Sequence, residues 1–170
     1  MGATLDVVHF ELGGEEYALD IQLAREIVEM MPITPIPKSP PYLAGIINLR
    51  GEITTILDLG TLLGFPKKEK LNGQKIIVLV PETAHGANVG VIVDDVKSVV
   101  QVAEGDVERM GGALSSELSS YVKGIIKMTN RENEREAHQR KSAVQENGCG
   151  LIVWLDMLKL MGNILQTSTS

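Results

Sequence analysis

The sequence predicts an all-β protein of barrel or sandwich type with short helices, and three observations support this prediction. Many short runs rich in Ile and Val are separated by Gly, Asn, Asp or Pro. The turn signals between these runs recur at short intervals along the chain. Part of the pattern at 42–64 returns at 121–162, which indicates two related halves.

The first expected elements are a hairpin and a connector. Residues 7–12 and 17–21 are β-type runs that flank Gly13 and Gly14, an arrangement typical of a hairpin. Residues 32–41 contain five prolines. Because proline has no backbone N–H, this stretch is not a central strand, and we expect an extended connector on the surface.

The elements that follow are short strands with tight turns and one short helix. The expected strands are 46–49, 53–57, 74–80, 88–93 and 98–102. Residues 50–52 predict a tight turn between the first two of them. Residues 58–63 predict a short helix, because Asp58 stands near its start, where an anionic side chain is favoured. Residues 156–161 predict its counterpart.

Two paired motifs carry the internal repeat. YLAGII at 42–47 returns as YVKGII at 121–126, and LDL at 57–59 returns as LDM at 155–157. Chance similarity between apolar strands is the alternative, but the two motifs recur in the same order, which favours duplication. The first copy also carries Asn-Leu-Arg-Gly at 48–51, which the second copy lacks.

The second copy contains additional chain at 129–148. This segment is polar and charged and has few large apolar residues, so we expect an exposed loop insertion, and deletion of 131–146 should leave the fold intact. A weaker match between 24–28 and 96–100 extends the repeat towards the start of each half.

Composition excludes several classes of protein. The net charge of −6 disfavours binding to nucleic acid and to anionic membrane surfaces. The N-terminus shows no signal peptide, and the longest apolar run, 151–155, is too short to insert into a bilayer. Cys149 is the only cysteine, so no internal disulfide forms, which fits a reducing cytoplasm.

No catalytic or metal-binding constellation is visible in the sequence. His9, His85 and His138 lack a second ligand at metal spacing, and there is no nucleotide-binding glycine motif or nucleophile elbow. Asp94 and Asp95 follow the expected strand 88–93, and because adjacent strand residues point to opposite faces the two carboxylates do not converge, so a solvated strand end or a turn is the favoured interpretation. We therefore expect no enzymatic activity, no metal and no cofactor.

Glu26 and Arg50 are the prominent charged residues, because both stand beside apolar strand residues. A charge in such surroundings needs a partner or a function. An ion pair between them and a patch that binds a partner protein are both open readings, and the two are compatible. The nearby prolines stiffen the connector and reduce the entropy lost when a partner docks.

Four motifs together resemble one known family. They are F-x-LG-x-x-x-Y-x-LDI at 10–21, REI at 25–27, P-x-YL-x-GIINLRG at 40–51 and LDL at 57–59. In this order and context they closely resemble the CheW family, the adaptor proteins of bacterial and archaeal chemotaxis. The similarity covers roughly residues 7–161.

The resemblance implies a pair of five-stranded SH3-like β-barrels around a shared hydrophobic core. The whole chain, 1–170, is then a single CheW-like domain. The first barrel is expected mainly from 15–85, and the second mainly from 88–160 with residues 1–14 contributing.

The resemblance also implies a non-enzymatic role. Members of the family bind the regulatory domain of the histidine kinase CheA and the cytoplasmic tip of chemoreceptors, the methyl-accepting chemotaxis proteins. They couple receptor state to kinase activity in signalling arrays. For this chain that implies a cytoplasmic protein, monomeric when isolated and recruited to membrane-associated arrays.

Matching the family's motifs residue by residue suggests two binding surfaces. The expected receptor-binding residues are Ala24, Glu26, Gly45, Asn48, Arg50 and Gly51. The expected kinase-binding residues are Ile33, Leu43 and Ala44. Ala24 stands where a larger valine is common in the family, so its side-chain contact is smaller.

Three other functions compete with the one that the CheW resemblance implies. A CheW-like module of a larger signalling protein, of the CheA or CheV type, is the closest, although the short flanks of the matched region favour a stand-alone adaptor. A hydrolytic or ligand-binding β-barrel needs convergent polar groups, and the sequence offers none. A barrel that binds single-stranded nucleic acid needs a basic groove with aromatics, but aromatics are 4% of this acidic chain.

Overall fold

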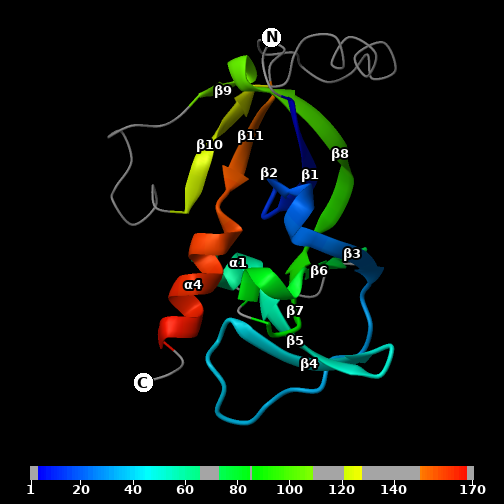
Figure 1. Ribbon diagram of the computed structural model, residues 1–170. Helices are drawn as coiled ribbons and strands as arrows, with labels where there is room; N and C mark the ends of the chain where they lie inside the picture. Colours follow the sequence, from blue (N-terminus) through cyan, green and yellow to red (C-terminus); the bar gives the residue numbers. More distant parts are fainter. Residues whose placement is uncertain (1–3, 66–72, 85, 109–120, 128–149, 168–170) are drawn as a thin grey trace.

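The computed structural model describes residues 4–65, 73–84, 86–108, 121–127 and 150–167. Within these residues the chain forms two β-sheets (Figure 1), which confirms the all-β prediction. The SH3-like form of each barrel stays a prediction. The predicted insertion at 129–148, together with His85, His138 and Cys149, lies outside the described residues.

One sheet has six strands in the order β8-β1-β2-β11-β10-β9, and the other has five in the order β3-β6-β7-β5-β4. The six are β1 (Thr4–Leu12), β2 (Glu15–Asp20), β8 (Asp95–Ala103), β9 (Val107–Glu108), β10 (Val122–Lys127) and β11 (Leu151–Leu155). The five are β3 (Ala24–Glu29), β4 (Leu43–Leu49), β5 (Glu52–Asp58), β6 (Lys75–Leu79) and β7 (Val89–Val93). All the strands expected from the sequence are present, whereas β3, β9, β10 and β11 were not predicted as strands.

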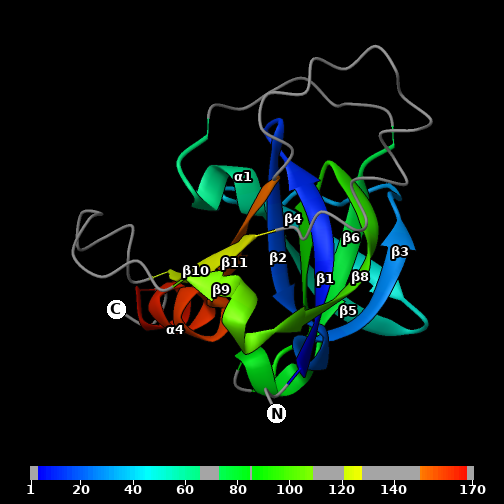
Figure 2. The same ribbon diagram turned by 90° about the horizontal axis from the view of Figure 1, so that it is seen from above.

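Both sheets repeat one pairing plan, in agreement with the internal repeat. The β1–β2 hairpin pairs antiparallel with β8 and parallel with β11, and the β6–β7 hairpin pairs antiparallel with β3 and parallel with β5. Figure 2 shows β8, β1, β2, β11 and β10 following one another across the six-stranded sheet. Each hairpin therefore joins the strands of the other copy.

This exchange changes the approximate division of the halves at two strands. β2, at 15–20, lies in the six-stranded sheet, and β7, at 89–93, lies in the five-stranded sheet. Each of these strands forms a parallel pair with a strand of the other copy. Ala18 of β2 pairs with Trp154 of β11, and Gly90 of β7 pairs with Ile56 of β5. Each hairpin is thus tied to the partner copy by its second strand as well as its first.

Three apolar clusters form the interior. The largest takes residues from both sheets and from the helices α1 (Leu59–Leu62) and α4 (Met157–Thr167). A second cluster lies within the six-stranded sheet and a third within the five-stranded sheet. Val7 belongs to the second cluster and Val8 to the shared one, as the alternation of side chains along β1 requires. The shared core expected from the resemblance is present.

The paired LD motifs perform the same task in both copies. Asp58 Oδ1 accepts a hydrogen bond from the Thr61 N–H at 3.3 Å, and Asp156 Oδ1 accepts one from the Lys159 N–H at 3.1 Å. Each aspartate thereby satisfies a free backbone donor at a helix start. α1 is as short as predicted, but α4 continues beyond the predicted 156–161.

Short 3₁₀ helices complete the described elements: η1 (Ile21–Leu23), η2 (Pro81–Ala84) and η3 (Glu104–Asp106). Among the helices that the structure describes, none has the length and apolar character needed to cross a membrane.

Candidate functional site

The motif at 48–51, which only the first copy carries, forms a tight turn between β4 and β5. Arg50 and Gly51 have φ angles of 53° and 85°, and Leu49 pairs with Glu52 across the turn. Positive φ at both central residues is what a two-residue type I′ hairpin turn requires. Asn48 Oδ1 accepts a hydrogen bond from the Gly51 N–H at 2.9 Å. The predicted turn is confirmed, and it holds Arg50 in a backbone conformation that non-glycine residues rarely adopt.

A β-bulge on β3 faces this turn. Ala24 pairs with Leu79 and Glu26 with Val78, so Arg25 is an extra residue in the strand. A bulge bends a strand and re-aims its side chains. Here two successive side chains, those of Arg25 and Glu26, both reach the turn.

Glu26 and Arg50 form an ion pair. Arg50 Nη2 lies 2.9 Å from Glu26 Oε2, and Arg50 Nη1 donates to Glu26 Oε1 at 3.4 Å. The Glu26 side chain is only 18% exposed, whereas that of Arg50 is 74% exposed. A carboxylate this far from water needs a partner. The ion-pair reading is therefore correct, and the exposed guanidinium leaves the docking reading open.

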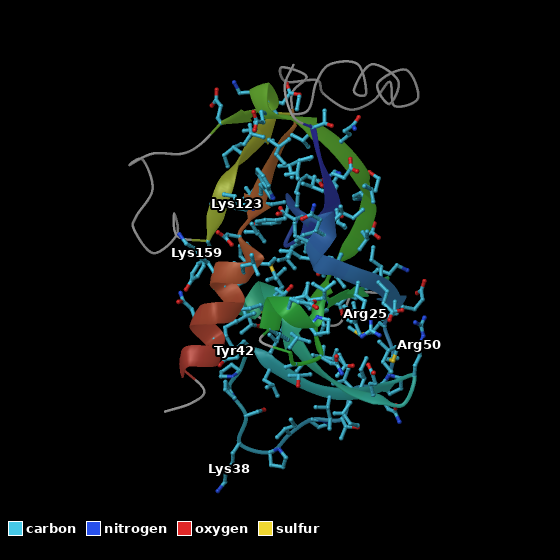
Figure 3. The ribbon with its side chains drawn as sticks, in the orientation of Figure 1. Arg25, Lys38, Tyr42, Arg50, Lys123 and Lys159 are labelled. Carbon is cyan, nitrogen blue, oxygen red and sulfur yellow. The ribbon has the colours of Figure 1, made fainter. Side chains whose placement is uncertain are left out.

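A second ion pair ties the same turn to β3. Arg25 Nη1 lies 3.5 Å from Glu52 Oε2, and both side chains are about half exposed. Figure 3 shows Arg25 and Arg50 close together beside β3 and the end of the hairpin. Sequence reasoning did not assign Arg25 or Glu52 to the site. The signal was the reciprocal order of charges, Arg-Glu at 25–26 against Arg-Gly-Glu at 50–52.

Gly45 lies apart from this charged group and is buried. Its φ is +146°, and a Cβ there would lie 2.2 Å from the Thr34 carbonyl oxygen and 2.7 Å from Ile33 Cγ2. Thr34 and Ile46 exchange two backbone hydrogen bonds of 2.9 Å, which place the connector directly across β4. Gly45 therefore provides room for the connector. The matching Gly124 likewise provides room for a neighbouring segment, here β9, because a Cβ there would lie 2.6 Å from Val107 Cγ1.

The structure groups the predicted receptor-binding residues in part. Ala24 and Glu26 lie on β3, while Asn48, Arg50 and Gly51 lie at the end of the β4–β5 hairpin, and the ion pair joins the two sets. Gly45 is placed beneath the connector instead.

The predicted kinase-binding residues are all half-buried, and they pack against two different apolar clusters. Ile33 and Ala44 pack against the apolar cluster within the five-stranded sheet. Leu43 packs against the shared cluster. The register of β4 shifts between Leu43 and Gly45, so Ala44 is an extra residue in this strand.

Three other carboxylates are engaged in structural contacts. Asp94 accepts a hydrogen bond from the Gly13 N–H at 2.8 Å, Asp95 lies 3.5 Å from Lys97 Nζ, and Asp20 accepts from Trp154 Nε1 at 2.5 Å. In the part of the chain that the structure describes, no three His, Cys, Asp or Glu side chains gather as a possible metal site.

Comparison with known proteins supports the resemblance to the CheW family that the sequence motifs indicate. The CheW-like domain family matches residues 6–164. A relative in Bacillus subtilis (strain 168), "Chemotaxis protein CheW", is 30% identical over 125 residues, covering 74% of this chain and 78% of the relative. A protein of the same name in Rhizobium meliloti (strain 1021) is 30% identical over 126 residues, covering 74% and 79%.

A solved structure extends the similarity to the fold. The crystal structure of the scaffolding protein TtCheW from Thermoanaerobacter tengcongensis matches with a TM-score of 0.68 and 28% sequence identity, covering 92% of this chain and 90% of that one. The matched span includes both copies of the repeat and the charged turn. The chain therefore belongs to the CheW family.

Proposed function

We propose that this protein is a non-enzymatic adaptor that couples chemoreceptors to the histidine kinase CheA. The observation that carries the proposal is the Arg50 turn, where an exposed guanidinium is held over a largely buried carboxylate on a chain of the CheW family. Its relatives are named as chemotaxis proteins, and the matching solved structure is described as a scaffolding protein.

The receptor surface consists of Ala24, Glu26, Asn48, Arg50 and Gly51, and Gly45 contributes to it only through the packing of the connector on β4. Arginine presents several fixed donors and recognises carboxylates and backbone carbonyls well. The Glu26 carboxylate and the turn hold the Arg50 side chain near one position before the partner arrives.

The kinase surface consists of Ile33, Leu43 and Ala44 with the connector that crosses β4. These side chains are partly exposed and anchored in the interior, so they offer apolar contacts on a rigid base. The prolines of the connector fix much of its backbone in advance. Each interface is modest in size, and an adaptor that joins two partners gains from the raised effective concentration.

The proposal places the protein in the cytoplasm, monomeric when isolated and recruited to receptor arrays at the membrane. It requires neither metal nor cofactor.

Loss of the Arg50 guanidinium tests the proposal. We expect Arg50→Ala to weaken binding to the cytoplasmic tip fragment of a chemoreceptor from the same genome, with little change in binding to the CheA regulatory domain. Arg50 is mostly exposed, but its loss leaves the largely buried Glu26 carboxylate without this partner, so the fold should lose about 1–3 kcal/mol. Lys159→Ala on α4, far from the turn in Figure 3, is the matched control for removal of one positive charge.

Isothermal titration calorimetry with both partners measures the two affinities, and a thermal melt checks the fold. Equal loss of both affinities would mean that Arg50 supports the whole structure rather than one docking surface. Absence of wild-type binding to the kinase domain at high micromolar concentration would contradict the adaptor proposal.

A further inference from the structure

We propose that Arg25 and Glu52 are positioning residues for the receptor-binding turn. Their ion pair holds the end of the β4–β5 hairpin against β3 when Arg50 leaves Glu26 to contact the receptor. The inference rests on the proposed function and adds to it a pair of residues and a mechanism.

Two ion pairs, here called ties, join the turn to β3, and the strand supplies the anion in one and the cation in the other. Glu26 of the strand pairs with Arg50 of the turn, and Arg25 of the strand pairs with Glu52 at the start of β5. The first tie contains the group offered to the receptor, so receptor contact and the tie compete for the same guanidinium. The second tie contains no such group and persists in the bound state.

The turn needs a persistent tie because its backbone is held in an uncommon conformation. Arg50 has a φ of 53°, a left-handed value that non-glycine residues rarely adopt. Such conformations persist only where the surroundings fix them. Asn48 fixes one side of the turn through the Gly51 N–H. Arg25 and Glu52 fix the other side.

Glu52 also accepts a hydrogen bond from Asn88, a residue outside β3. Asn88 Nδ2 donates to Glu52 Oε2 at 3.4 Å, and the Asn88 carbonyl accepts a hydrogen bond from the Thr55 N–H at 2.9 Å. The Glu52 carboxylate therefore connects β3, the start of β5 and the segment before β7. This places a fixed anion where Arg25 can hold the hairpin end.

The second copy of the repeat also has a bulge, on β8. β8 has a bulge at the matching place, because His9 pairs with Ser98 and Phe10 with Val96, which leaves Lys97 as the extra residue. Lys97 Nζ lies 3.4 Å from Glu11 and 3.5 Å from Asp95, on neighbouring strand positions. Both copies therefore have the bulge, and in the first copy its extra residue, Arg25, pairs with Glu52 beside the turn that contains Arg50.

A charge-swap cycle tests the inference on the full chain. The variants are Arg25→Glu, Glu52→Arg and the double variant R25E/E52R, titrated with the receptor tip fragment and, separately, with the CheA regulatory domain. Each single variant should weaken receptor binding by about fivefold at low salt, the range of one exposed ion pair. The double variant restores the pair and should recover most of the wild-type affinity. Kinase binding should stay unchanged throughout.

Two further measurements keep the result interpretable. Thermal melts check that each variant folds, and Glu52→Gln provides a neutral variant that retains an acceptor for Asn88 while losing the charge. The differences should shrink in about 0.5 M salt, where exposed charges are screened.

The outcomes separate the inference from the proposed function. If wild-type protein binds the receptor tip but the single variants bind equally well, or the swap fails to restore binding, the positioning role is wrong. Failure of the swap alone would show that Arg25 and Glu52 touch the receptor directly. If wild-type protein does not bind the receptor tip at all, the proposed function fails and the inference fails with it.

Discussion

Substitution of Gly45 by alanine tests whether this glycine serves the fold or the partner. The added Cβ would lie 2.2 Å from the Thr34 carbonyl oxygen and 2.7 Å from Ile33 Cγ2. The nearest atom is the carbonyl oxygen of Thr34, and Thr34 exchanges two backbone hydrogen bonds with Ile46 of β4, so this oxygen cannot move away without breaking those bonds. We expect Gly45→Ala to destabilise the protein strongly.

The magnitude follows from two effects. A non-glycine residue at a φ of +146° costs about 1–3 kcal/mol. Displacement of the connector by the methyl group costs about 1–3 kcal/mol more, as for overpacking of a core. At about 2–4 °C per kcal/mol for a chain of this size, the melting temperature should fall by roughly 10 °C.

Differential scanning calorimetry provides the measurement, and two other glycines provide controls. Gly105→Ala should be nearly neutral, because nothing lies within 4 Å of the added Cβ. Gly124→Ala should cost less than Gly45→Ala, because its closest atom is Val107 Cγ1 of a side chain. A Gly45→Ala variant that melts like wild type yet fails to bind the receptor tip would refute the packing argument and make Gly45 a direct contact.

Two further predictions concern stability. Burial, and secondly the charge of Glu15, raise the pKa of the Tyr17 hydroxyl above its ordinary value, so the folded state favours the protonated form. This contribution is complete below the unfolded-state pKa and is lost as the pH rises through the folded-state pKa, so melting temperatures should fall above about pH 10, and less steeply in Tyr17→Phe. An identical alkaline decline in both proteins would show that this hydroxyl is not responsible. Trp154→Phe removes the indole N–H that donates to Asp20 at 2.5 Å and leaves that carboxylate with Lys123 at 3.0 Å, which should cost about 1–3 kcal/mol in urea denaturation followed by circular dichroism. A loss below about 0.5 kcal/mol would mean that Lys123 alone satisfies Asp20.

Much of the fold follows from local sequence, because strands and turns are signalled within a few residues. The hairpin around Gly13 and Gly14, the tight turn at 50–52 and the two LD helix starts needed only neighbouring residues to be recognised. β3 was missed because its alternating exposed and half-buried residues include three charges, and the run is short on Ile and Val.

The exchange of hairpins between the copies was not predictable in the same way. A repeat shows which strands correspond, but each hairpin pattern fits its own copy and the other copy equally well. Long-range pairing decides, here through β2 beside β11 and β7 beside β5. The sheets therefore differ from the expected halves, 15–85 and 88–160 with 1–14, at one strand of each hairpin, β2 and β7.

The candidate site was predictable to the extent that it lies within motifs. Glu26 and Arg50 were identified from charge among apolar neighbours, and their ion pair is present. Arg25 and Glu52 were missed because their contact depends on the bulge, which exists only relative to the register of β6. Gly45 was assigned to a binding surface through its motif, although the crossing of the connector explains the need for glycine there.

One measurement tests the central claim most directly: sedimentation velocity of the protein mixed with the CheA regulatory domain and the receptor tip fragment. The adaptor account predicts a species that contains all three components with wild-type protein. With Arg50→Ala it predicts only the binary complex with the kinase domain. Mutually exclusive binding of the two partners, or a ternary species that Arg50→Ala leaves unchanged, would contradict the account.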